Sequence, residues 1–441
     1  MKRESSTFIT FIKKTTACIM KPTNTGQSNA NINKSALFNG SCFALITTAF
    51  TFSIRAGILP QLGESFGLTA EQLGFINSMW FLGFPISMIL GGIFYHTIGP
   101  KTIMTVAFFC HTAGILLTIF AGGYNTLLIS TLLIGVGNGC TEAACNPMIA
   151  DMYSGVTMQK MLGRFHMWFP GGILVGSLIS FFMTKMGASW QAQMWVTMIP
   201  TVAYAVLFFG KTFPKSHVAE ATSFKENFKA MGSPVYIFLF CCMALTAITE
   251  FGPSQWVSIV LGASGANAML ILALTNGISA VGRFFAGPVV GRLGQTGVLL
   301  MGAILATIGI YLFSSVTGPM AYVAAIVYAL GICYFWPVMI GSVAHRVPRS
   351  SALGMSIVGG VGMFSTSIFQ PIIGGWIDSA RAANTAKGLS GTALELATGQ
   401  QSLIKMMTFP AILIVAFIIF FIWQKNAKTE ATESEMTMAV H

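Results

Sequence analysis

The chain has 441 residues, of which 54% are hydrophobic and only 8% are charged, against about 25% charged residues in a typical soluble domain. So little charge cannot cover a water-soluble fold of this length, and the composition therefore predicts an integral membrane protein. The formal charge of +11 would favour a nucleic-acid partner in a soluble protein. In a membrane protein the position of the charges along the chain is more informative than their sum. We therefore expect the chain to contact a lipid bilayer and to bind no nucleic acid.

Signatures of cofactor chemistry are absent from the sequence. All of the eight cysteines except Cys18 lie in apolar stretches, which favours small core residues over a disulfide framework. No His or Cys spacing typical of a metal site occurs, and no GxxxxGK[ST] phosphate loop. We therefore expect no cofactor and no metal, and we expect neither an enzyme nor an ATP-driven pump.

Twelve apolar stretches are long enough to span a bilayer, which takes about 20 residues in a helix. Continuous runs of this kind differ from the alternating ten-residue segments of a β-barrel, so the predicted fold class is all-α. In chain order the stretches are 38–61, 72–97, 101–122, 124–150, 161–186, 190–210, 234–261, 267–292, 296–315, 318–344, 352–378 and 403–424.

The basic residues indicate the orientation of these spans, because cytoplasmic loops are enriched in Lys and Arg. With the N-terminus in the cytoplasm, 18 of the 24 Lys and Arg residues fall in cytoplasmic segments, four in outside loops and two within spans. Both termini are therefore predicted to be cytoplasmic, in a plasma membrane of the bacterial inner-membrane type. The predicted parts are a cytoplasmic tail (1–37), a six-helix bundle (38–210), a cytoplasmic connection (211–233), a second six-helix bundle (234–424) and a cytoplasmic tail (425–441).

Features of the first half recur in the second at a nearly constant offset. Gly92 and Gly287 are 195 residues apart, and Pro147 and Pro337 are 190 apart. Recurrence at a fixed offset indicates an internal repeat. Twelve helices in two parallel six-helix halves, joined by a basic loop, resemble the major facilitator architecture.

The cytoplasmic loop pattern of that superfamily, GxLaDRxGrK, is half kept. Lys101 remains in the first copy and Arg292 in the second, and Arg283 stands where the superfamily often has an Arg. The resemblance implies that Lys101, Arg283 and Arg292 form a cytoplasmic gate. Simple anchoring of the helix ends by positive charge is an equally good interpretation.

Three charged residues lie well inside predicted spans, namely Arg55, Glu142 and Glu250. A charge at mid-bilayer costs roughly 2.5–3.5 kcal/mol on insertion scales, so such residues are functional candidates by default. The alternative is a structural ion pair. Residues four apart share a helix face, and polar residues follow that spacing in three spans: Asn138, Glu142 and Asn146; Thr246, Glu250 and Ser254; Thr47, Thr51 and Arg55.

The depth of these charges predicts how they pair. Arg55 and Glu250 both lie late in spans that run outward, whereas Glu142 lies late in a span that runs inward. We therefore predict that Arg55 and Glu250 form an ion pair or gate. Pairing of Arg55 with Glu142 stays open. Glu142 then lacks a cation at its own depth, and loss of hydration favours its protonated form. It is the candidate for proton coupling.

Polar and aromatic residues near these charges are the candidate solute contacts. Stacking on a sugar face would use Trp256, which follows Gln255, or Trp336, which precedes Pro337. Interfacial anchoring is the alternative for most tryptophans. The predicted solute-binding residues are Asn138, Glu142, Asn146, Gln255, Trp256 and Trp336.

One motif makes the resemblance more specific. Residues 135–147, GVGNGCTEAACNP, fit GxGxGxxExxxNP and resemble the span-four signature of the fucose:proton symporter branch of the major facilitator superfamily. The resemblance implies that Glu142 and Asn146 lie in a sugar cavity and that Glu142 couples transport to protons. The family's span-one acid is missing, since Arg55 or Ala56 occupies its place. This departure puts the two-carboxylate coupling scheme in doubt.

These observations predict a secondary transporter, monomeric, that moves a sugar or similar small polar solute with a proton by alternating access. One alternative is an organic-anion or sugar-acid transporter in which Arg55 binds the carboxylate. A different class of function, a membrane sensor that transports nothing or a lipid flippase, is the remaining alternative.

Overall fold

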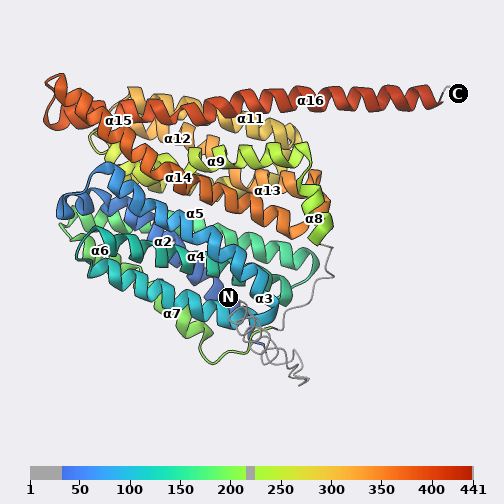
Figure 1. Ribbon diagram of the computed structural model, residues 1–441, viewed down its shortest axis with the longest axis horizontal. Coiled ribbons are helices and arrows are strands. Elements are labelled where there is room, and N and C mark those ends of the chain that lie inside the picture. The colour runs from blue at the N-terminus through green and yellow to red at the C-terminus, as the bar shows by residue number, and fades with distance from the viewer. Residues whose placement is uncertain (1–31, 215–223, 440–441) are drawn as a thin grey trace, which may run out of the picture.

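The protein is a bundle of helices. The computed structural model describes residues 32–214 and 224–439, and this part of the chain contains helices and no strand (Figure 1). The predicted all-α membrane fold is thereby confirmed. Many large apolar side chains face outward, among them Phe109 (65% exposed), Val206 and Ile419. Such a surface suits helices that are surrounded by lipid.

The helices are labelled as in Figure 1. Their bounds are α2 Lys34–Phe66, α3 Ala70–Ile119, α4 Tyr124–Met152, α5 Gly155–Lys185, α6 Trp190–Val196, α7 Met198–Phe208, α8 Phe224–Met231, α9 Pro234–Val260, α10 Ala268–Phe284, α11 Ala286–Ser315, α12 Met320–Ile332, α13 Phe335–Arg346, the short 3-10 helix η2 Pro348–Ser350, α14 Ser351–Ala386, α15 Gly391–Met406 and α16 Thr408–Ala439.

Nine helical stretches in the described residues are long and apolar enough to cross a membrane. Two helices are interrupted by glycines with positive φ, Gly99 in α3 (78°) and Gly294 in α11 (69°). Only glycine adopts such φ values readily, and both breaks fall where the sequence predicts a connection between spans. Predicted spans six and ten fall on the helix pairs α6–α7 and α12–α13. The count of twelve spans stays a prediction.

We name the two ends of the bundle after the ends of α2. At the Lys34 end, Lys34 Nζ donates to the carbonyl oxygen of Met152, where α4 ends (2.6 Å). At the Phe66 end, α2 stops at Gly67 and α3 begins after Thr69.

Helices α2 to α7, blue to green, occupy one side of Figure 1, and α9 to α16, yellow-green to red, occupy the other. Between them, α3 and α14 touch backbone to backbone toward the Phe66 end. A Cβ on Gly74 would lie 2.5 Å from a backbone oxygen of α14, and Gly374 faces the backbone of α3 just as closely. The hydroxyl oxygens of Ser78 and Ser367 lie 2.9 Å apart. We call this contact between the halves the seam.

The predicted tails and connection are covered only in part. Residues 1–31 of the N-terminal tail and 215–223 of the connection lie outside the described residues. Residues 440 and 441, at the end of the predicted C-terminal tail (425–441), also lie outside the described residues. Helix α16 continues to Ala439 and extends beyond the other helices in Figure 1. Its last residues are rich in Lys, Glu, Ala and Met, which all favour helix.

Candidate functional site

Glu142 and Asn146 form a hydrogen-bonded pair on α4, and both are partly buried. The Asn146 amide nitrogen donates to the Glu142 backbone oxygen (3.2 Å) and to Glu142 Oε2. Pro147 follows directly and has no N–H to donate to the carbonyl of Ala143. Among the described residues Glu142 makes no ion pair, and Asn146 Oδ1 is a buried acceptor without a partner. The pair therefore offers one free acceptor and one carboxyl group close together.

Arg55 is buried on α2 and bridges the two halves. Its Nε and Nη2 donate to Gln255 Oε1 on α9 (3.2 and 2.7 Å). Gln255 donates in turn to the backbone oxygen of Phe52 (3.2 Å), and the Arg55 guanidinium lies 5.3 Å from the ring centre of Trp80. Within the described residues Arg55 Nη1 is buried without a hydrogen-bond partner. Gln255, predicted to contact solute, is fully buried in this bridge.

The predicted pair of Arg55 with Glu250 does not form in this structure. Glu250 instead faces Arg283, with 3.6 Å between Glu250 Oε1 and Arg283 Nη2. Two features explain the error. Arg55 and Gln255 each lie six residues before the predicted ends of their spans, at 61 and 261, so their depths match better than those of Arg55 and Glu250. The long Arg283 side chain also reaches inward from the end of α10.

Prolines in α9 and α13 free two backbone carbonyl groups near this pair, and one of them binds Arg283. Pro253 cannot donate to the Thr249 carbonyl, and the Tyr328 hydroxyl donates to it instead (2.7 Å). Pro337 likewise frees the carbonyl of Cys333, which accepts from Arg283 Nε (3.4 Å). A helix interior loses one backbone hydrogen bond at each proline. Here side chains of neighbouring helices replace those bonds.

Replacing Tyr328 with Phe should lower stability by about 1 kcal/mol, because one buried carbonyl loses its donor. The measurement is the melting temperature in detergent, with the exposed Tyr311→Phe as the matched control. In a Pro253→Ala background the loss should shrink, since the restored N–H again satisfies the Thr249 carbonyl. Equal losses in both backgrounds would contradict this account.

Asn138 is held by other residues than the Glu142–Asn146 pair. It is fully buried, and its Oδ1 lies 2.9 Å from His111 Nε2. His111 Nδ1 lies 3.0 Å from the Tyr204 hydroxyl. This network packs α3, α4 and α7 together inside one half. Nothing in the local sequence indicates this partner of Asn138 in another helix, and its contact with solute stays a prediction.

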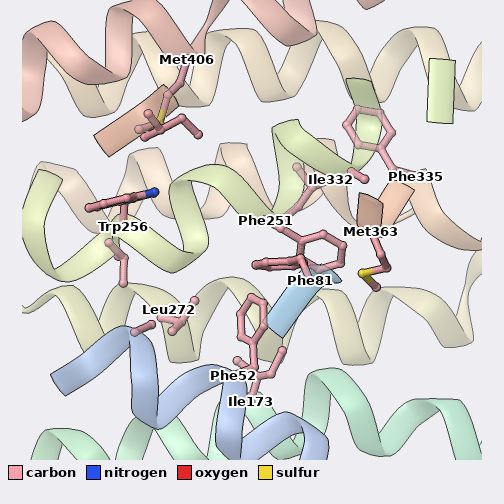
Figure 2. Packing of buried hydrophobic residues seen from close by; sticks show 14 of the residues in the cluster. Phe52, Phe81, Ile173, Phe251, Trp256, Leu272, Ile332, Phe335, Met363 and Met406 are labelled. Atoms are coloured by element: carbon pink, nitrogen blue, oxygen red, sulfur yellow. The ribbon is translucent and has the colours of Figure 1, made fainter. Parts of the chain in front are cut away.

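The two predicted tryptophans have different surroundings. Trp256 is fully buried, and Figure 2 shows it between Leu272 and Met406, apart from the central rings. It offers no face to a solute in this structure, which corrects its predicted position. Trp336 is partly buried and lies 6.1 Å from the ring of Phe251.

Rings from both halves meet at the centre of the molecule. Phe52 and Phe81 of one half contact Phe251 of the other, each at 5.8 Å between ring centres, and Figure 2 shows the three rings grouped. Aromatic contacts of this kind add to the gain from burial. With the seam, these rings hold the two halves together near the centre of the molecule.

The three predicted gate cations do not share one environment. Lys101 and Arg292 are exposed near the glycine breaks of α3 and α11, whereas Arg283 points inward to Glu250. In this structure Arg283 is therefore paired inside the bundle, unlike the exposed Lys101 and Arg292. A gating role of Lys101 and Arg292 stays a prediction.

One charged group at the Phe66 end was missed. Asp378 of α14 accepts from the backbone N–H groups of Ala70 and Glu71 (3.0 and 2.8 Å), and Arg381 bridges Asp378 and Glu395. Asp378 is the last residue of predicted span eleven. A carboxylate at the end of a span was the feature of the sequence that could have indicated this group. A cavity of about 640 Å³ opens beside this group, lined by both halves.

Comparison with known proteins gives one family. The model of the Major Facilitator Superfamily matches residues 41–369. A hexuronate transporter of Bacillus subtilis is 28% identical over 38% of this chain and 40% of its own length. The L-fucose-proton symporter of Escherichia coli is 30% identical over 28% of each chain. These matches span less than half the length of either relative.

Solved structures with the same fold are also transporters. The D-xylose-proton symporter superposes with a TM-score of 0.68 at 15% identity, covering 85% of this chain and 97% of its own. The nucleoside transporter NupG also gives 0.68, at 13% identity, covering 88% and 98%. At such low identity the likeness concerns the fold alone.

Proposed function

The chain belongs to the Major Facilitator Superfamily, and from this premise we propose that it carries a sugar or sugar-like solute together with a proton by alternating access. Its relatives are named transporters, so it is a multi-pass membrane transporter and not an enzyme. The positive-inside bias supports a Lys34 end in the cytoplasm of a plasma membrane. The seam then closes the outer side.

The observation that carries this proposal is the Glu142–Asn146 pair. A carboxyl group that can take a proton stands beside a buried amide oxygen that can accept a hydrogen bond from a solute hydroxyl. Coupling requires that binding of the proton and binding of the solute affect each other. Because Glu142 and Asn146 are adjacent, a proton on one and a solute on the other interact directly. Two of the similar proteins are named as proton symporters of sugars. In this scheme Asn146 and Glu142 contact the solute, and Trp336 stacks on it.

The test is uptake into proteoliposomes by the purified protein. A panel of neutral sugars and sugar acids is offered with and without an inward proton gradient. The proposal expects at least one member to accumulate only with the gradient. If no member of the panel is transported, or if accumulation is the same with and without the proton gradient, the proposed coupling is wrong.

A sugar acid is the second candidate, and Arg55 supports it. This guanidinium is buried, and its Nη1 has no partner among the described residues, so a carboxylate could take up that N–H. One relative is named a hexuronate transporter, and another a probable anion transporter. Rearrangement of the Gln255 bridge would open the way to Arg55.

Replacing Arg55 with Gln should then weaken uptake of the acid about 10- to 150-fold, because a hydrogen bond to a charged group contributes about 1.5–3 kcal/mol. Arg55→Lys, which keeps the charge, should retain part of that uptake. The measurement is the KM for acids and for neutral sugars in the same liposomes. A similar loss for neutral sugars would argue against carboxylate recognition.

A further inference from the structure

The first turn of α3 is capped in two ways. Thr69 Oγ1 accepts from the Gln72 N–H (3.2 Å), and Gln72 Oε1 accepts from the Thr69 N–H (3.0 Å). This capping box leaves the N–H groups of Ala70 and Glu71 without an acceptor in their own half, because the first N–H groups of a helix have no helical partner. Both donate to one carboxylate, that of Asp378 in the other half.

Neighbouring charges hold Asp378 in this position. Arg381 stands one turn later on α14, and its Nη1 lies 3.8 Å from Asp378 Oδ1. The same guanidinium donates to both carboxylate oxygens of Glu395 on α15 (3.1 and 2.8 Å). A two-point contact fixes the plane of the guanidinium. Arg381, itself fixed by Glu395, therefore holds the Asp378 carboxylate in the position from which it binds α3.

The seam continues along α3 into the turn after this cap. Gly74 and Gly374 bring the two backbones together, and the hydroxyls of Ser78 and Ser367 meet further along. The Lys34 end differs, because a Cβ at Gly92 or Gly287 would meet no atom within 4 Å. Among these glycines, the approach of backbone to backbone between the halves thus lies on the side that carries Asp378.

We propose that Asp378 is a positioning residue for transport, whose carboxylate caps α3 across the two halves and holds the Phe66 end closed. The inference rests on the alternating-access function proposed above, since opening this end must break both hydrogen bonds to Asp378. A negative charge at a helix N-terminus is favourable, and the contact exists only while α3 and α14 touch. The cap therefore stabilises one conformation and not the helix as such.

The experiment measures how often the seam opens. Ser78 is buried in the seam (6% exposed), so in a Ser78→Cys protein a bulky maleimide can react there only after opening. The labelling rate at residue 78 is followed by mass spectrometry of its peptide, which separates it from the native cysteines. Loss of a cap in Asp378→Ala should raise this rate about fivefold. Asp378→Asn should have an intermediate effect, since one amide oxygen can replace only one of two acceptors.

Glu71→Gln is the matched control. It removes a neighbouring carboxylate but keeps the backbone N–H that Asp378 binds, so its labelling rate should stay at the parent value. The melting temperature of each variant separates opening of the seam from general loss of structure, and Asp378→Asn serves if Asp378→Ala does not fold. An unchanged rate in the Asp378 variants, or an equal rise in Glu71→Gln, would overturn the proposal. No solute is needed, so failure of the proposed function leaves this result intact.

Discussion

Replacing Glu142 with Gln is expected to abolish accumulation of solute against its gradient while exchange of solute across the membrane continues. Gln has nearly the shape of a protonated Glu but cannot release a proton. Asn146 can still donate to the amide oxygen of the new side chain in place of Glu142 Oε2, so solute binding should survive. Coupling needs differential binding of the proton in the two conformations, and the substitution removes that difference.

The measurement compares proton-driven uptake with counterflow in the same liposomes. A loss of at least about tenfold in accumulation is expected, because a gradient of one pH unit corresponds to about 1.4 kcal/mol, or tenfold. Glu226→Gln, the same change at an exposed position of α8, should leave both activities unaltered. Accumulation that persists in Glu142→Gln would move proton coupling to another group.

Removing either member of the Glu250–Arg283 pair is expected to destabilise the protein by on the order of 3 kcal/mol, because breaking a buried pair leaves the other charge without compensation. This loss of stability is larger than the net contribution of the intact pair to stability, because it includes the cost of the charge that is left unpaired. Glu250 is 9% exposed, the Arg283 side chain is 22% exposed, and Glu250 Oε2 has no partner among the described residues. Glu250→Gln should therefore leave Arg283 facing a neutral amide, and Arg283→Gln should leave Glu250 unpaired.

A double-mutant cycle measures this pair through the free energy of unfolding in detergent. The double variant should recover much of the loss, since no charge remains unpaired. The comparison pair is Arg381 and Glu395, whose side chains are 35% and 41% exposed. Exposed pairs contribute roughly 0–1 kcal/mol, so Glu395→Gln should have a small effect. Additive losses at 250 and 283 would show that the two groups do not interact.

The sequence predicted the architecture because the bilayer imposes simple rules. Long apolar runs must become helices, and the positions of Gly99 and Gly294 between predicted spans match the observed breaks. Within one helix the prediction also succeeded. Glu142 and Asn146 are four residues apart, and this spacing places their side chains in contact without any knowledge of the neighbours.

Contacts between helices were harder to predict. Arg55 was matched with an acid, although the neutral Gln255 stood at its depth. Arg283 was assigned to a helix end, because sequence does not show how far a long side chain reaches inward. Asn138 and Trp256 turned toward partners in other helices. Rotation of a helix about its axis is set by packing, which a list of apolar residues does not contain.

The glycine contacts of the seam have a consequence for the temperature dependence of the cycle. Where Gly74 and Gly374 let two backbones touch, the halves adhere through dispersion forces and hydrogen bonds more than through burial of large apolar side chains. Helix association inside membranes depends mainly on such contacts. When the seam opens, water replaces these close contacts, and the looser packing of water against the separated backbones recovers only part of the lost dispersion enthalpy. A large activation enthalpy for opening the Phe66 end would follow, and exchange rates would rise steeply with temperature.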